Sequence, residues 1–310
     1  MPAVGLDISD AAVTALELVR RKGASAVGRY GRRPLPRGAV ADGYVHDKER
    51  VVAELRALKK DLRLSFVNAS LPEEKAYLYT SALPPVSAKE IRGAIELTLE
   101  ENVPLSPGEA LFDYTVLGNK IASPNAVSEI AVTVLPRAVV RTYAELFSAA
   151  GLVPLSFELR AQAVCRAVIL HGDRGAYLVL HLEEGKAGIF IVRDEAVRFT
   201  ATVALHEASI GGAGEERGAI RPDFAAEIRA EVLKHIAYWQ THADSSREAG
   251  DSITSIVLCG REEDSALVAE ELSHSLAVPV ETANIWRNGF SFDEYIPPIL
   301  SEESFEYAAA

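Results

Sequence analysis

The sequence predicts an α/β protein of two lobes, and two observations support this expectation. A strand, a tight turn and a second strand occupy residues 4–10 and 12–19, near the start of the chain. The same arrangement recurs in the second half, at residues 177–186 and 188–192. With 310 residues, of which 48% are hydrophobic, the chain is long enough to bury two separate cores.

The charge and the cysteine content exclude several classes of protein. A formal net charge of −12 makes the chain a poor general binder of nucleic acid, whose phosphates would repel it. Cys165 and Cys259 stand far apart and lack metal-ligand spacing, so we expect neither a metal centre nor a disulfide. The N-terminus lacks the pattern of a signal peptide, and no run approaches the ~20 apolar residues of a membrane span. We therefore expect a cytoplasmic protein that reaches a membrane only through a partner.

The first lobe begins with a β-β-β-α-β unit. Two prolines end its third strand, Asp47 caps its helix, and Pro72 closes its fourth strand. Apolar residues recur at helical spacing between Val51 and Leu62. In chain order, these elements are expected at residues 3–8, 12–19, 25–32, 48–62 and 64–71.

A basic stretch covers the third strand of this unit. We favour a solvated hairpin at a sheet edge, where charge discourages pairing with another edge. The alternative is a patch that faces anionic lipid or an acidic tail of a partner. Between Val19 and Val40 the chain carries no acid and seven basic residues, which are Arg20, Arg21, Lys22, Arg29, Arg32, Arg33 and Arg37.

A second unit, of order β-α-β-β-α-β, predicts a small separate subdomain. Ser87 and Glu90 form a capping box before its first helix, and Gly151 stands where a C′ glycine ends the second. Pro154 restricts the last strand to a sheet edge. The elements are expected at residues 75–83, 91–99, 110–117, 128–135, 137–150 and 152–158. Their apolar faces predict one shared core of Ile91, Ile95, Leu99, Val116, Ile130, Val132, Val134, Val140 and Phe147.

The remaining sequence repeats the plan of the first lobe. A linking helix at residues 159–170 precedes the second hairpin, and a glycine cluster at 211–214 breaks the chain after a third strand. A long helix, a buried strand, another helix and a short strand follow, and a last helix starts at Ser301. From the third strand to the short strand, these elements are expected at residues 196–205, 222–242, 253–258, 264–276 and 278–281.

A set of short motifs runs in order through nearly the whole chain. They are VGLDI (4–8), ALEL (15–18), ASLPEEK (69–75), EENVPL (100–105), FDYTVLG (112–118), AAGL (149–152), EI (227–228) and YW (238–239). No single motif is diagnostic, but their shared order and spacing argue against chance. By these motifs the chain resembles the PilM family of type IV pilus assembly proteins, which are relatives of the division protein FtsA.

The resemblance implies an actin-like (ribonuclease H-like) α/β fold of duplicated lobes with an inserted α+β subdomain of the FtsA/PilM type. It divides the chain into a first lobe at residues 1–73 and 158–174, an inserted subdomain at 74–157 and a second lobe at 175–310. The sequence ends at Ala308-Ala309-Ala310, where relatives continue into a further helix, so we expect a reduced second lobe.

The resemblance also implies a partner and a cofactor. In that family the protein binds the cytoplasmic N-terminal tail of the membrane protein PilN and can hold ATP with Mg²⁺. The groove for the tail is expected between the first lobe and the inserted subdomain.

The first phosphate loop implied by the resemblance contains Asp7, Ser9 and Asp10. The family has glycine where this chain has Ser9, and the added Cβ stands where backbone would approach a phosphate. A phosphate contact and a plain hairpin turn both remain open for these residues.

The second phosphate loop implied by the resemblance contains Glu183, Glu184 and Gly185. His181 and Glu183 replace the family's aspartate and glycine, and Lys186 only partly offsets the two glutamates. We interpret His181 as a structural residue rather than a catalytic base. We also expect an exposed turn here, in which replacing Glu183 with Gly changes stability by less than ~1 kcal/mol.

The adenosine end of the implied site also departs from the family. Gly260 keeps one of two expected glycines, but Arg261 replaces the second and would crowd a nucleoside. A helix that relatives place between Gly211 and Pro222 cannot be found in this sequence. We therefore expect ATP and Mg²⁺ binding to be weak or lost, and an adaptor with doubtful ATPase activity. The alternatives are an active actin-like ATPase and a filament-forming protein.

Overall fold

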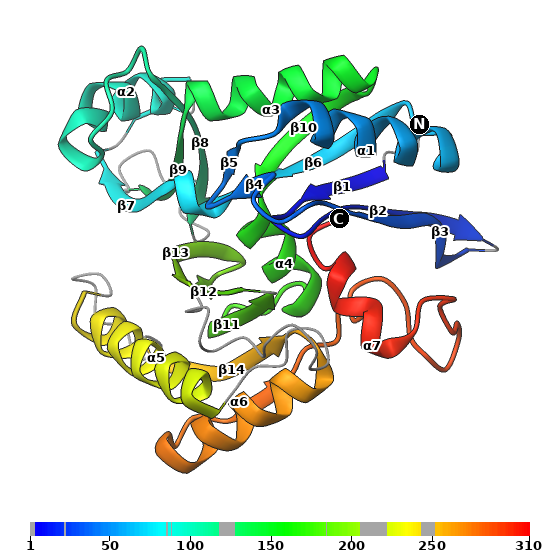
Figure 1. The fold of residues 1–310 in the computed structure, drawn as a ribbon. Helices are drawn as coiled ribbons and strands as arrows, with labels where there is room; N and C mark the ends of the chain where they lie inside the picture. The colour runs from blue at the N-terminus through cyan, green and yellow to red at the C-terminus, as the bar shows by residue number, and fades with distance from the viewer. Residues whose placement is uncertain are drawn as a thin grey trace.

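The computed structural model describes residues 4–21, 23–84, 86–87, 89–117, 128–183, 185–204, 222–242 and 252–310. Two five-stranded mixed sheets form the centres of an upper and a lower lobe (Figure 1). A three-stranded sheet stands beside the upper lobe, at the opposite side from the β2–β3 hairpin. None of the helices in the described ranges is long and apolar enough to cross a membrane.

The first sheet confirms the predicted β-β-β-α-β unit. Its strand order is β10-β6-β1-β2-β3, in which β1 and β2 form the first hairpin and β6 lies parallel to β1. The strand that contains Pro154 lies at the sheet edge, as predicted, with a bulge between Pro154 and Ser156. The strands are β1 (Val4–Ile8), β2 (Ala12–Arg21), β3 (Ala24–Pro34), β6 (Phe66–Leu71) and β10 (Val153–Leu159), and a short pair β4 (Val40–Ala41) and β5 (Tyr44–Val45) precedes the helix.

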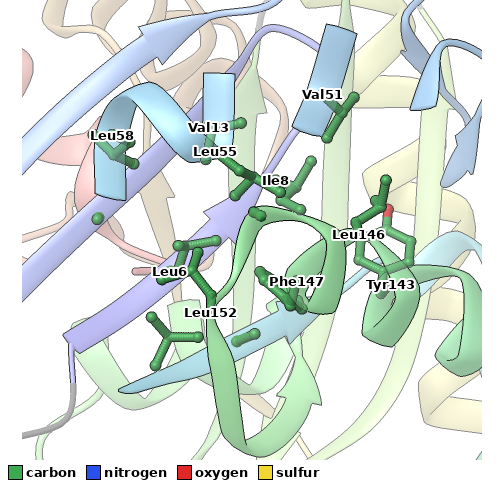
Figure 2. Packing of buried hydrophobic residues seen from close by; sticks show 14 of the residues in the cluster. Leu6, Ile8, Val13, Val51, Leu55, Leu58, Tyr143, Leu146, Phe147 and Leu152 are labelled. Atoms are coloured by element: carbon green, nitrogen blue, oxygen red, sulfur yellow. The ribbon is translucent and has the colours of Figure 1, made fainter. Parts of the chain in front are cut away.

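Two helices cover one face of the first sheet, α1 (Lys48–Leu62) and α3 (Arg137–Ala150). The Asp47 carboxylate accepts a hydrogen bond from the Arg50 backbone N–H at 2.9 Å, so the predicted cap forms. Gly151 ends α3 in the left-handed region, with φ of 71°. Figure 2 shows side chains from β1, β2, α1 and α3 packed in one core, among them Leu6, Ile8, Val13, Val51, Leu55, Tyr143, Leu146 and Phe147.

The three-stranded sheet has the order β7-β9-β8 and is all antiparallel. Helix α2 covers one of its faces, and Ser87 bonds the Glu90 carboxylate just before the helix begins, at 2.7 Å from Oγ. The elements are β7 (Tyr77–Leu83), α2 (Ile91–Asn102), β8 (Ala110–Leu117) and β9 (Ser128–Pro136). Their core contains seven of the predicted residues, which are Ile91, Ile95, Leu99, Val116, Ile130, Val132 and Val134.

The predicted core was wrong for Val140 and Phe147, which pack in the core of the first lobe. Helix α3 puts its apolar stripe on the first sheet beside α1, and β10 pairs with β6. The physical reason is that α2 already covers the apolar face of the small sheet, whereas the first sheet has room for a second helix. Residues 137–157, expected in the inserted subdomain, therefore pack with the first lobe.

The second sheet repeats the first in topology. Its order β13-β12-β11-β14-β15 has an antiparallel hairpin, an antiparallel third strand and two parallel strands, as in the order β3-β2-β1-β6-β10. Helices α5 (Pro222–His242) and α6 (Glu262–Ser275) lie on its outer side (Figure 1). The strands are β11 (Ala176–Glu183), β12 (Lys186–Arg193), β13 (Ala196–Ala204), β14 (Ile253–Cys259) and β15 (Val280–Thr282).

Helix α4 (Arg160–Val168) connects the lobes and packs against the second sheet in a core that also contains Ala308 and Ala309. The C-terminal segment, with α7 (Ser301–Ser304) and η4 (Phe305–Tyr307), returns to the first lobe. A Cβ on Gly5 would lie 2.1 Å from the carbonyl carbon of Ala310, so only glycine allows this approach. The last residues therefore touch both lobes.

Candidate functional site

The two predicted phosphate loops face each other between the lobes. In the first, the Ser9 hydroxyl oxygen accepts hydrogen bonds from the backbone N–H groups of Ala11 and Ala12, at 3.3 and 3.1 Å. Ser9 therefore closes the hairpin turn. In the second, Gly185 turns the chain with φ of 84°, and Glu184 lies outside the described residues.

Buried charges fill the space between these turns, and we call this group the interlobe ion cluster. The first lobe contributes two aspartates, two glutamates of the short helix η1 (Glu73–Lys75) and the first residue of α4. The second lobe contributes three residues of β11 and β12. The members are Asp7, Asp10, Glu73, Glu74, Arg160, His181, Glu183 and Lys186.

Lys186 makes the closest bonds between the two lobes. Its Nζ lies 2.5 Å from Glu74 Oε1 and 3.1 Å from Asp10 Oδ2, and the side chain is only 6% exposed. Burial alone would lower the pKa of Lys186, but the carboxylates around it, Glu183 first, raise it above its ordinary value. Lys186 is therefore a charged residue bound inside the protein.

Arg160 is the second cation and is 2% exposed. Its Nε lies 3.0 Å from Asp7 Oδ1, its Nη2 donates to the Ile8 carbonyl oxygen at 2.7 Å, and its Nη1 lies 3.6 Å from Glu183 Oε1. The Ser70 hydroxyl donates to the same Asp7 carboxylate. Arg160 thus fixes the end of β1 and meets the second lobe through Glu183.

Glu183 corrects the expectation of an exposed turn. Its side chain is 15% exposed, and Oε1 lies 3.1 Å from His181 Nδ1 as well as 3.6 Å from Arg160. Burial would raise the pKa of Glu183, but Arg160 and His181 together hold it well below its usual range. The premise of a small effect for Glu183→Gly was wrong, because the turn packs against the first lobe. His181 lies buried on β11 beside Glu183.

Glu73 differs from the other carboxylates of the cluster. It is 3% exposed, and among the residues that the structure describes its Oε2 finds no hydrogen-bond partner. Burial first, and then Glu74 and Glu183, raise the pKa of Glu73 to about 7 against the opposing effect of Arg160 and Lys186. Five carboxylates thus surround two permanent cations, and a proton on Glu73 reduces the imbalance near neutral pH.

The predicted adenosine-end residues lie outside the cluster. A Cβ on Gly260 would lie 2.6 Å from Leu182 Cβ, so this glycine allows β14 to approach β11. Arg261 Nε donates to Asp264 Oδ2 at 2.7 Å, on its own helix α6. The stretch that lacks the expected extra helix falls outside the described residues. Within the described residues, no group of histidine, cysteine and carboxylate side chains has the arrangement of a metal site.

Sequence reasoning missed Arg160, Glu73 and Glu74 as members of the cluster. Arg160 is separated from Asp7 by 153 positions, so no local pattern joins them. One available signal was an arginine at the start of the apolar linking helix. The other was a pair of adjacent glutamates directly after a buried strand.

A groove lies between the first lobe, the small sheet and the second lobe, with a volume of about 870 Å³. Strands β8 and β9 line it with alternate side chains, such as Asp113, Thr115, Ala131 and Thr133, whose neighbours in sequence face α2. Further walls come from β10, α4, β12 and β13. Gln162 Nε2 donates to Thr133 Oγ1 at 3.4 Å and joins α4 to the small sheet. A cavity therefore lies where the partner groove is expected, and its use by a partner stays a prediction.

Four of the charged side chains at the groove form two pairs. Arg166 contacts Glu158 at 2.5 Å, and His171 Nδ1 lies 2.7 Å from Glu195 Oε1. Apolar and polar side chains together line the groove, which suits an extended peptide segment.

Three of the seven basic residues in this stretch of the first lobe form ion pairs within the fold. Arg29 bonds both carboxylate oxygens of Glu17 at 2.8 Å, and this pair lowers the pKa of Glu17. Arg32 pairs with Glu306, and Arg33 pairs with Asp61. These contacts agree with the interpretation of a charged sheet edge, whereas Lys22 lies outside the described residues.

Comparison with family models decides the relationship. The model of the type IV pilus assembly protein PilM matches residues 5–175, which is more than half of the chain. The chain belongs to the PilM family. This confirms the resemblance drawn from the motifs, and a comparison with curated protein sequences found no match.

Solved structures agree with membership of the PilM family. A PilM-PilN type IV pilus biogenesis complex matches with a TM-score of 0.79 and 18% identity, over 100% of this chain and 96% of that one. The cytoplasmic domain of EpsL, an inner-membrane component of the type II secretion system of Vibrio cholerae, matches with a TM-score of 0.50 and 11% identity. This match covers 94% of this chain and 100% of that one. The ethanolamine utilization protein EutJ from Carboxydothermus hydrogenoformans matches with a TM-score of 0.50 and 14% identity, over 93% of this chain and 88% of that one. The fold is therefore the actin-like ATPase α/β fold with two mixed sheets.

Proposed function

We propose that this chain is a cytoplasmic adaptor of an inner-membrane assembly platform, of the type IV pilus or type II secretion kind. It binds the cytoplasmic N-terminal tail of a PilN-like membrane protein and reaches the membrane only through that partner. Membership of the PilM family and the likeness to a PilM-PilN complex support this proposal. The observation that carries it is the 870 Å³ groove between the first lobe and the small sheet.

The parts of the molecule have matching roles in this proposal. The small sheet with α2 is the inserted subdomain of the FtsA/PilM type and supplies one wall of the groove. The second lobe repeats the sheet of the first and closes the groove through β12 and β13. The faces of β8 and β9 that are turned away from α2 offer side-chain contacts to an extended tail.

The adaptor binds nucleotide weakly or not at all. Lys186 and Arg160, the cations between the two hairpin turns, are both bound by carboxylates of the protein. A triphosphate in this position would face Asp10, Glu74 and Glu183, and like charges ~4 Å apart cost on the order of 1–4 kcal/mol at ordinary effective dielectrics. The residues present therefore do not fit the polyphosphate of ATP with Mg²⁺.

A peptide-binding experiment tests the adaptor. A fluorescent peptide with the N-terminal sequence of the PilN-like protein from the same organism is titrated with the full chain, and saturable binding is expected. Thr133→Trp fills the groove and should abolish it, whereas Ser148→Trp, on the exposed face of α3, should leave it unchanged. Equal binding by both variants would place the tail elsewhere, and no binding by the unmodified chain would contradict the proposal.

A further inference from the structure

We infer that the interlobe ion cluster sets the width of the groove, so that Lys186 is a positioning residue of the partner site. This rests on the proposed function of the groove, and it adds a second, buried determinant of partner affinity.

The first step is that both lobes form the groove. Leu71, Phe157 and Leu159 belong to β6 and β10 of the first lobe. Val192 and Val197 belong to β12 and β13 of the second lobe. Any rotation of one lobe against the other therefore changes the distance between opposite walls.

The second step is that the same elements connect the cluster to the groove. Arg160 is the first residue of α4, and the last turn of that helix carries the groove residues Cys165 and Arg166. Lys186 is the first residue of β12, and Val192 near its other end lines the groove. A short helix and a central strand are stiff, so a shift at the cluster is carried to the walls.

The third step is that the cluster joins the lobes by several bonds at once. Lys186 crosses to Glu74 at 2.5 Å and to Asp10 at 3.1 Å, and Glu183 approaches Arg160 at 3.6 Å. Beyond the cluster, Arg198 Nη1 donates to Thr80 Oγ1 at 3.2 Å, from β13 to the small sheet. Because these side chains lie away from water, salt screens them little, and the bonds hold one lobe orientation.

The fourth step is the excess of negative charge. With Lys186 in place, its ammonium lies between carboxylates of the two lobes. Without it, Asp10 and Glu74 of the first lobe face Glu183 of the second across the same gap. The cluster then changes from attraction to repulsion, and the lobes are expected to separate at this end.

The test uses the full chain, a fluorescent peptide of the PilN-like tail and three cluster variants at a temperature where all remain folded. Lys186→Met and Glu74→Gln should weaken binding about tenfold, the size typical of mutations that act through a coupled element. Lys186→Arg keeps the charge and should retain affinity within about threefold. The matched control is Val232→Ala, a core change in α5 distant from groove and cluster, which lowers the melting temperature but should leave affinity unchanged.

A distance measurement separates this inference from the proposed function. Spin labels are placed at Ser148 on α3 and at Lys234 on α5, both exposed, while the native cysteines Cys165 and Cys259 are buried. Lys186→Met should lengthen or broaden the distance between the labels, and Val232→Ala should not. If the unmodified chain binds no peptide, the proposed function fails and this measurement still tests the cluster. An unchanged distance together with unchanged affinity in folded Lys186→Met would overturn the inference.

Discussion

Glu183 illustrates, at the scale of single residues, how a charge becomes part of a protein interior. A carboxylate removed from water needs compensating partners, since desolvation costs several kcal/mol per ion. Glu183 has Arg160 from the first lobe and His181 from its own strand, and Lys186 lies 3.9 Å away. Removing one member therefore leaves the others buried without their partner.

Replacing Glu183 with Gly is expected to lower the free energy of unfolding by about 3 kcal/mol, because it breaks a buried ion pair. Urea unfolding followed by circular dichroism measures the change. Glu231→Ala removes a carboxylate that pairs with Lys234 on the surface of α5, and it should cost no more than ~1 kcal/mol. Equal effects of the two substitutions would show that the cluster contributes nothing beyond an exposed pair.

Glu73 should make the folded protein less stable as pH rises, which is the reverse of the usual effect of a carboxylate in an ion pair. Its pKa rises from an ordinary 4.5 in the unfolded chain to about 7 in the folded protein, chiefly through burial. The folded state therefore binds this proton more tightly, and stability is lost as pH rises from 4.5 to about 7. Glu73→Gln removes that loss. The melting temperature of the variant minus that of the unmodified chain should increase over this window, and a constant difference would contradict the assignment.

At the scale of elements, the C-terminal segment completes the first sheet region. Ala308 and Ala309 are buried beside α4, and Ala310 lies against Gly5 in β1. Tyr307 packs with Leu16, Val27 and Trp286 in a separate cluster below the first hairpin. Because Gly5 has no side chain, β1 can contact the residues around Ala310.

Gly5→Ala is expected to displace this segment and to destabilise the protein by about 1–3 kcal/mol, the usual cost of overpacking. Limited proteolysis should then cut the chain after Leu300 faster than in the unmodified protein. The matched control is Gly93→Ala in α2, where a Cβ meets no atom within 4 Å. This control should stabilise by about 0.5–1 kcal/mol, because alanine favours helix more than glycine does. Unchanged proteolysis in Gly5→Ala would contradict the role given to the segment.

Elements of strong local pattern could be predicted from the sequence. The alternation of apolar residues predicts both hairpins, and the structure contains them. Asp47 caps α1 and Gly151 ends α3, as their residue types predict. The position of α3 could not be predicted in this way. Which sheet its apolar stripe covers depends on where the other helices pack, and α2 covers the small sheet.

The candidate site was predictable only in part, for a related reason. Asp7, Asp10 and Glu183 were identified as loop residues, but their partners come from distant segments. Arg160 and Glu74 meet the loops only after both lobes have folded, so neither spacing nor composition reveals the cluster. The groove likewise forms between three sheets whose strands are far apart in the sequence, so no local pattern predicts its position.

At the scale of the whole molecule, the two lobes meet at the ion cluster, at α4 and at the groove. The ion cluster lies near the hairpin turns, α4 passes between the sheets, and the groove opens beyond α4. This arrangement predicts how the molecule responds to nucleotide.

Calorimetric titration with ATP and Mg²⁺ should give no binding with a Kd below about 1 mM, because the phosphates would have to displace bound carboxylates. Replacing His181 with Asp and Glu183 with Gly together should not restore tight binding, since Lys186 stays bound to Glu74 and Asp10. A Kd in the low micromolar range for the unmodified chain would overturn the adaptor reading in favour of an ATPase. An apparent molecular mass from light scattering that rises with protein concentration would favour a filament.

The pairing of β10 with β6 has a consequence for synthesis on the ribosome. Strand β6 ends at Leu71, but its outer neighbour begins at Val153, so one edge of β6 has no partner while the intervening residues are made. At ~5–20 residues per second, those roughly 80 residues take about 4–16 seconds. During that interval the nascent chain presents an open strand edge, a template for pairing with other chains. Fragments that stop before β10 should therefore aggregate, and in vitro translation of chains ending at residues 136 and 170 would reveal the difference by sedimentation.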